Sequence, residues 1–198
     1  VVVSDSPTGP FVAYEGVDAN GKQLNSHDEP IFRHNDSIGL GVLDQTMFVD
    51  DDGSMYMYYS VYDTNRSQYI VGFEMKDPVT PDWDTYKILV RPGEATAKET
   101  YNYSKFFWEA YTGFEVAEGP QMIKSPNGKY YLTYSVNHYP NKYYTVCYAV
   151  SDSPLGDFEK PYEEGKLWTN LIMGYSGTND EESLVYNQWN GFASGTGH

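Results

Sequence analysis

Two acidic residues, Asp44 and Glu118, have the side-chain type and the spacing that acid–base chemistry requires. They lie 74 positions apart, and each one enters a stretch of strand-forming residues. His198 follows Glu118 by 80 positions and enters a comparable stretch. If a structural repeat brings these positions to one axis, the carboxyl groups can share proton transfer as a general acid and a general base.

Each of these three residues also has a structural interpretation. Asp44 is compatible with a turn residue that caps backbone amides, a common use of aspartate. Glu118 is compatible with a solvated loop carboxylate ahead of Gly119 and Pro120, and His198 with a hydrogen-bonded structural histidine. The shared spacing favours the functional interpretation of the two acids.

The segment ahead of Glu118 contains further candidates. Phe107 and Trp108 carry rings that can stack on the apolar face of a sugar, with packing of the segment onto the fold as the alternative. Glu109 and Glu115 are alternative proton donors. Neither of them precedes a Gly-Pro pair or shares the strand register of Glu118.

No part of the sequence carries a strong metal-binding pattern. Asp50–Asp52 clusters the oxygen ligands that calcium prefers, but the spaced ligands of a calcium loop are missing, so a hairpin turn is predicted. The single cysteine, Cys147, lies in a Tyr/Val-rich run that predicts a buried strand thiol. We therefore expect no required metal or other cofactor.

An internal repeat provides the elements that position these residues. The run 53–61 resembles 128–136 at an offset of 75, and 4–11 recurs as 151–158 at an offset of 147. Each unit of about 75 residues consists of short strand-like runs separated by turns. Four-stranded units in series predict an all-β propeller, with a β-sandwich as the alternative.

The repeat divides the chain into parts of such a propeller. The first strand of each blade lines the central channel, so Asp44 and Glu118 would enter neighbouring inner strands. Propellers close with roughly 4–8 blades, so we expect part of a propeller whose open blade faces favour self-association. The predicted parts are 1–40 (outer first blade and connecting loop), 41–94 (second blade), 95–116 (insertion), 117–165 (third blade) and 166–198 (connection and start of the next blade).

Composition narrows the class of ligand. The net charge is −15, which argues against nucleic acid and anionic membrane surfaces as partners and fits a neutral ligand such as a sugar. The 20 tyrosines favour strands with half-wet surfaces. The sequence contains no apolar run of the roughly 20 residues that a membrane-spanning helix needs.

The same residues carry a resemblance to glycoside hydrolase family 43. The run 43–56 resembles the second-blade motif of that family, in which an Asp precedes a Phe and an Asp-Asp-Gly turn. The runs 118–135 and 143–158 resemble its third-blade motif, and 195–198 resembles the Gly-x-Gly-His that opens a later blade. The resemblance covers nearly the whole chain.

This resemblance implies a fold and a set of roles. Members are five-bladed β-propellers that hydrolyse arabinose- or xylose-containing glycans with inversion of configuration. Glu118 is similar to the general acid that protonates the leaving oxygen, and Asp44 to the aspartate that modulates the acid's pKa and positions it. His198 resembles the channel histidine, which in some relatives helps to hold a calcium ion or a water at the propeller centre.

One part of the family pattern has no match in the sequence. The general base of the family is an aspartate of the first blade, and the resemblance places it before Val1. We therefore expect a truncated glycosidase of plant polysaccharides or oligosaccharides that lacks its base. A non-catalytic glycan-binding propeller and a sucrose- or fructan-cleaving enzyme are the alternatives. The substrate class implies a secreted or periplasmic location.

Overall fold

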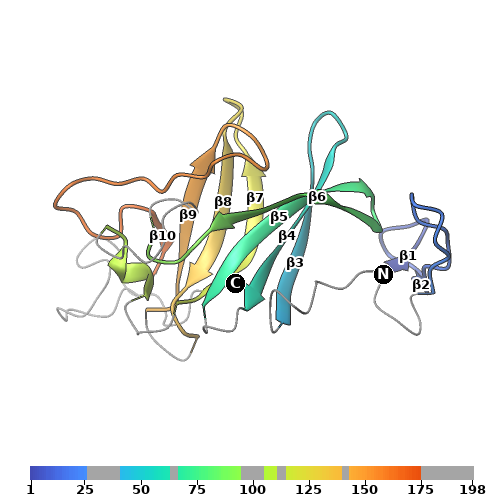
Figure 1. Ribbon diagram of the computed structural model, residues 1–198, viewed down its shortest axis with the longest axis horizontal. Helices are drawn as coiled ribbons and strands as arrows, with labels where there is room; N and C mark the ends of the chain where they lie inside the picture. Colours follow the sequence, from blue (N-terminus) through green and yellow to red (C-terminus); the bar gives the residue numbers. More distant parts are fainter. Residues whose placement is uncertain (26–40, 63–66, 95–104, 111–114, 140–142, 175–198) are drawn as a thin grey trace.

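The computed structural model describes residues 1–25, 41–62, 67–94, 105–110, 115–139 and 143–174. These residues form two four-stranded antiparallel sheets and one small two-stranded sheet (Figure 1). The first large sheet contains, in chain order, β3 (Gly41–Val49), β4 (Met55–Tyr62), β5 (Gln68–Asp77) and β6 (Thr80–Val90). The second contains β7 (Ala117–Lys124), β8 (Tyr130–Val136), β9 (Thr145–Ser151) and β10 (Leu171–Met173). The remaining elements are β1 (Val2–Val3), β2 (Val12–Ala13) and the 3-10 helix η1 (Phe107–Ala110).

Both large sheets open with the same hairpin. In the turn 50–54, the N–H of Gly53 donates to the carbonyl of Asp50 at 2.9 Å, and the N–H of Asp50 donates to the carbonyl of Ser54 at 2.8 Å. The turn 125–129 repeats both bonds at the same distances. Gly53 and Gly128 have φ values of 86° and 83°, which glycine adopts without steric cost. The offset of 75 found in the sequence is therefore a structural repeat.

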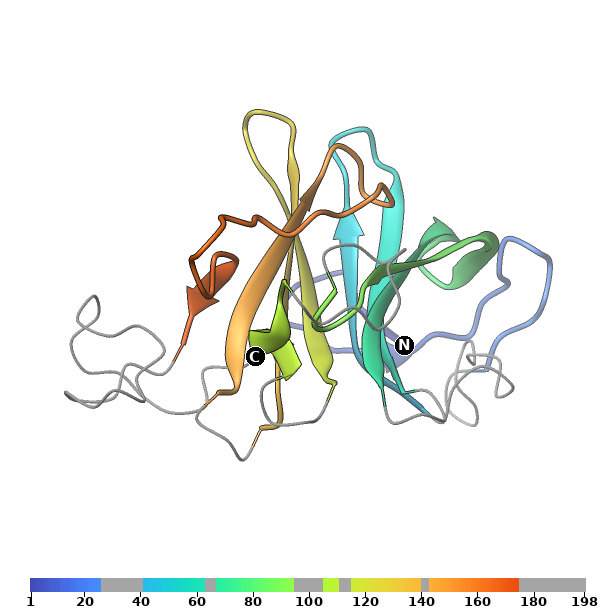
Figure 2. The same ribbon diagram turned by 60° about the vertical axis from the view of Figure 1, so that its left-hand side comes forward.

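The two large sheets lie side by side (Figure 2), and a cluster of buried apolar side chains from both sheets packs between them. Strands β8 and β9 largely alternate buried with half-buried residues, because one face of their sheet covers this core. The buried hydroxyl of Tyr58 donates to the carbonyl of Pro154 at 3.0 Å and links the sheets further. The arrangement confirms the all-β prediction. The core residues include Tyr58, Ile70, Leu89, Val90, Met122, Leu132, Tyr134, Val136, Cys147 and Phe158.

The fourth strand of the second sheet lies later in the sequence than the predicted end of the blade at residue 165. The chain after β9 contacts that strand through a single bridge, Val150–Glu159, and pairs with it again only at β10 (Leu171–Met173). The outer strand of this sheet therefore follows a long crossing segment and lies beyond residue 165, where the sequence prediction ended the third blade. The predicted blade boundaries stay predictions.

The insertion predicted at 95–116 is described in part. Its residues 105–110 contain the 3-10 helix η1, which lies beside the second sheet (Figure 2). In the described ranges, no helix has the length and apolar character needed to cross a membrane.

Candidate active site

A β-bulge interrupts the first strand of each large sheet at the same place. Leu43 pairs with Ser60 before the irregularity in β3, and the register has shifted by one residue when pairing resumes at Thr46. Glu118 pairs with Ser135 before the irregularity in β7, and pairing resumes shifted at Gln121. Bulges re-aim side chains and are frequent beside active sites. Both candidate acids lie at these two bulges.

The two acids do not occupy the same position of the repeat. An offset of 75 aligns Leu43 with Glu118 and Asp44 with Gly119, whereas the prediction placed Asp44 and Glu118 in one register. Backbone geometry confirms the corrected alignment, because Asp44 has φ 57° and Gly119 has φ 59°. The bulge adds one residue to each strand, and this residue is Asp44 in one sheet and glycine in the other.

The corrected alignment explains how the two acids are linked. The backbone N–H of Gly119 donates to Oδ2 of Asp44 at 3.0 Å. Aspartate is one of the few residues that tolerate this left-handed conformation. The carboxylate of Asp44 therefore fixes the backbone of the residue that directly follows Glu118, from one sheet to the next.

The left-handed conformation of Asp44 reverses the usual effect of glycine on stability. We expect Asp44→Ala to be less stable than Asp44→Gly by about 1–2 kcal/mol, because alanine carries the steric cost of positive φ and glycine does not. Both variants lose the hydrogen bond to Gly119, so the difference between their unfolding free energies measures the cost of the positive φ angle alone. Urea unfolding measures it, with Thr133→Ala and Thr133→Gly as the matched pair at an ordinary strand position, where glycine is the less stable. The same order at both positions would contradict the argument.

The carboxyl group of Glu118 accepts one hydrogen bond at each oxygen. The hydroxyl of Tyr144 donates to Oε1 at 2.5 Å, and Nε2 of Gln68 donates to Oε2 at 3.0 Å. Burial raises the pKa of Tyr144 well above its ordinary value, and the bond to Glu118 raises it further. The tyrosine hydroxyl therefore stays protonated as a donor. Sequence reasoning missed both partners, since neither belongs to a motif with a recognised role.

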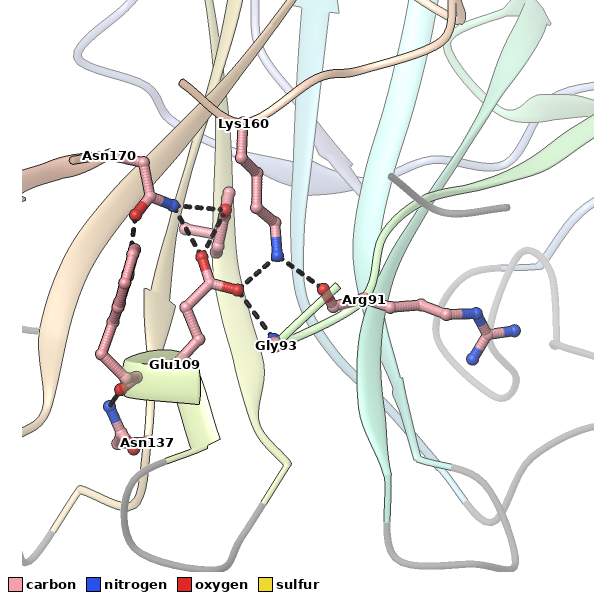
Figure 3. Close-up of polar contacts among 8 residues, drawn as sticks. Arg91, Gly93, Glu109, Asn137, Lys160 and Asn170 are labelled. Atoms are coloured by element: carbon pink, nitrogen blue, oxygen red, sulfur yellow. Dashed lines mark hydrogen bonds and ion pairs between the residues drawn. The ribbon is translucent and has the colours of Figure 1, made fainter. Parts of the chain in front are cut away.

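Glu109, one of the alternative proton donors, is a buried structural residue (Figure 3). Its carboxylate forms an ion pair with the buried Lys160 and accepts hydrogen bonds from Gly93 N–H at 2.9 Å and the Tyr134 hydroxyl at 2.9 Å. Nδ2 of Asn170 donates to it at 2.7 Å. With a side chain that is 0% exposed, Glu109 does not reach a substrate.

The aromatic candidates divide into a buried and an exposed ring. Trp108 is 1% exposed, and its indole N–H donates to Oδ1 of Asn170 at 3.0 Å. The ring also contacts that of Trp168, so it packs the insertion onto the fold, the alternative weighed from the sequence. Contact of Trp108 with a sugar stays a prediction. Phe107 is 41% exposed and remains a candidate for contact with a ligand.

Metal ligation finds no support in the described part of the chain, where no group of three or more His, Cys, Asp and Glu side chains could hold an ion. Asp50 instead accepts a hydrogen bond from Lys124 at 2.5 Å and one from the Tyr130 hydroxyl at 2.6 Å, as a hairpin residue tied to the next sheet. Cys147 is buried, and burial raises the pKa of its thiol. His198, with the calcium ion or water suggested for it, lies outside the described residues.

Comparison with known proteins places this geometry in a family. The sequence profile of the glycosyl hydrolases family 43 matches residues 1–180. An endo-1,4-β-xylanase from Bacteroides thetaiotaomicron VPI-5482 is 29% identical, with a TM-score of 0.53, covering 81% of this chain and 44% of that chain. A thermostable family-43 glycoside hydrolase is 28% identical, with a TM-score of 0.57, covering 83% and 45%. An endo-arabinase from the same Bacteroides strain shares the fold at 21% identity, with a TM-score of 0.54, covering 82% and 50%. No curated protein matches the sequence.

Two packed blades with carboxyl-bearing bulges on their first strands define a β-propeller of the glycoside hydrolase type. The chain belongs to the glycosyl hydrolases family 43, whose profile covers nearly all of it. It spans 44–50% of the length of the three structures described above. The family and the propeller architecture are thereby confirmed, and the five-blade count and the roles of the site residues stay predictions.

Proposed function

We propose that the source protein is an inverting glycoside hydrolase that acts on arabinose- or xylose-containing plant polysaccharides or oligosaccharides. One observation carries the proposal: Asp44 of one blade hydrogen-bonds the residue that follows Glu118 of the next blade, at 3.0 Å. Membership of the family and the likeness to a xylanase at 29% identity support the substrate class.

In this proposal Glu118 is the general acid. Its proton passes to the glycosidic oxygen as the bond from that oxygen to the anomeric carbon breaks. A water attacks the opposite face of the sugar and gives its proton to a second carboxylate, an aspartate that the family resemblance places outside residues 1–198. Asp44 fixes the backbone beside the acid and modulates it. Phe107 and His198 remain candidates for substrate contact, and a secreted or periplasmic location follows from the substrate alone.

The stereochemistry of the product tests this mechanism. We expect the source protein at its full natural length to release arabinose or xylose units whose first-formed anomer is opposite to that of the substrate, as proton NMR at early times shows. Retention of the anomer would contradict the proposal, and glycan binding without release would favour a binding module. Residues 1–198 alone are expected to release no sugar from aryl glycosides.

A further inference from the structure

Two neutral side chains from different blades hold the carboxyl group of Glu118. Tyr144, which directly precedes β9 of the same sheet, donates its hydroxyl to Oε1 at 2.5 Å. Gln68, the first residue of β5 in the neighbouring sheet, donates its amide N–H to Oε2 at 3.0 Å. With one donor on each oxygen, the orientation of the carboxyl plane is set by both blades together.

The backbone of Gln68 is attached to the strand that carries Glu118. Its N–H donates to the carbonyl of Glu115 at 2.8 Å, and Gln68 forms a parallel bridge with Val116. The backbone of Gln68 is therefore bound to the segment that leads into β7, at Val116, two residues before Glu118. This attachment holds the side-chain amide of Gln68 within reach of the carboxyl group of Glu118.

The amide of Gln68 is oriented toward the acid at a cost to its own hydrogen bonding. Gln68 is 0% exposed, and its Oε1 has no partner within the described ranges. A buried polar atom without a partner costs about 1–3 kcal/mol, and such an atom in a native structure calls for an explanation. The explanation offered by the geometry is the bond that the other end of the amide makes to Glu118.

Tyr144 is held as firmly as Gln68. It is 6% exposed, and its hydroxyl also contacts the side chain of Ser135, the residue that pairs with Glu118 across β7 and β8. The ring cannot turn away without breaking both contacts. The tyrosine hydroxyl and the glutamine amide can each donate or accept a hydrogen bond, so they suit a carboxyl group that must lose and regain a proton.

We infer that Gln68 and Tyr144 are positioning residues, which aim the carboxyl group of Glu118 at the glycosidic oxygen in both of its protonation states. The inference rests on the proposed function of Glu118 as the general acid. In the carboxylate state both residues donate to the oxygens, as the structure shows. Before substrate binds, the protonated carboxyl can donate its O–H to the tyrosine oxygen, or to Oε1 of Gln68 after a half-turn of the amide. With substrate bound, this O–H turns to the glycosidic oxygen while the other carboxyl oxygen keeps its donor.

Leaving-group dependence tests the inference, because only a poor leaving group needs the proton of a well-placed acid. The source protein at full length is assayed with a phenyl and a 2,4-dinitrophenyl glycoside of one sugar. We expect Tyr144→Phe and Gln68→Leu to lower kcat for the phenyl glycoside about tenfold or more, with little change for the dinitrophenyl glycoside. Both substitutions preserve volume, and Gln68→Leu removes the unpartnered oxygen. The matched control is Tyr148→Phe, four residues later on β9, whose ring stacks on Tyr131 with the ring centroids 6.0 Å apart.

Two outcomes would overturn the inference. One is an equal loss of kcat on both substrates, which indicates general damage to the fold, and the other is no loss on either. If the natural protein cleaves neither glycoside, the proposed function fails. In that case the two hydrogen bonds to Glu118 are tested by NMR, through the chemical shift of its carboxyl ¹³C. This resonance is assigned by its absence in Glu118→Gln. This resonance is expected to move in Tyr144→Phe and Gln68→Leu and to stay in Tyr148→Phe, and a resonance unmoved in both variants contradicts the inference.

Discussion

Replacing Lys160 with methionine is expected to lower the free energy of unfolding by about 3–5 kcal/mol, because it leaves a buried carboxylate without its counter-charge. The side chains of Lys160 and Glu109 are 2% and 0% exposed. The lysine also donates to the carbonyl of Arg91 at 2.7 Å, so one ammonium group joins the end of the first sheet to the insertion. Urea unfolding followed by tryptophan fluorescence measures the loss as a fall in midpoint.

The exposed pair Lys129–Asp152 provides a matched control for the buried pair. Its side chains are 45% and 85% exposed, so Lys129→Met should change stability by less than about 1 kcal/mol. The double variant Glu109→Leu/Lys160→Met removes both charges and should recover part of the loss, because no unpaired charge stays buried, although the donors of Gly93, Tyr134 and Asn170 lose their acceptor. Equal effects of Lys160→Met and Lys129→Met would show that the buried pair contributes no more than a surface pair.

The local parts of the fold could be predicted from the sequence because short turns depend on neighbouring residues. The acidic Gly turn at 50–54 and the Asn-Gly turn at 125–129 specify their own hairpins, and their shared offset gives the repeat. The family motif likewise makes Glu118 the candidate general acid from adjacent residues alone. These features need no knowledge of distant contacts.

Features that depend on distant contacts could not be predicted in this way. The sequence offset of 75 aligns Asp44 with Gly119, but a bulge adds one residue without changing the composition of a strand, so the two bulges themselves appear only in the hydrogen-bond register. The partner of Glu109 lies 51 positions away. Gln68 reaches Glu118 across 50 positions and from a different blade, and no local pattern marks it. The packing of Trp108 likewise depends on Asn170, 62 positions away.

The largest functional effect is expected for Glu118→Gln, assayed in the source protein at full length. A glutamine keeps the shape of the side chain but carries no acidic proton, so the leaving oxygen departs without protonation. General acid catalysis contributes about 10²–10⁴-fold to rate, and we expect a fall in kcat of that size for a phenyl glycoside. This fall corresponds to about 3–5 kcal/mol in the activation barrier. The fall should be much smaller for a dinitrophenyl glycoside.

The fold should survive this substitution, which makes the measurement interpretable. An amide at position 118 can turn its oxygen toward Nε2 of Gln68 and its nitrogen toward the oxygen of Tyr144, so both contacts of the natural side chain are kept. An unchanged urea midpoint checks this expectation. Glu115→Gln is the matched control, because Glu115 lies three residues earlier and its backbone carbonyl, which accepts from Gln68, is unaffected. Loss of activity in Glu115→Gln with retention in Glu118→Gln would assign the proton donor to Glu115. The reverse result separates Glu118 from its nearest rival in the sequence.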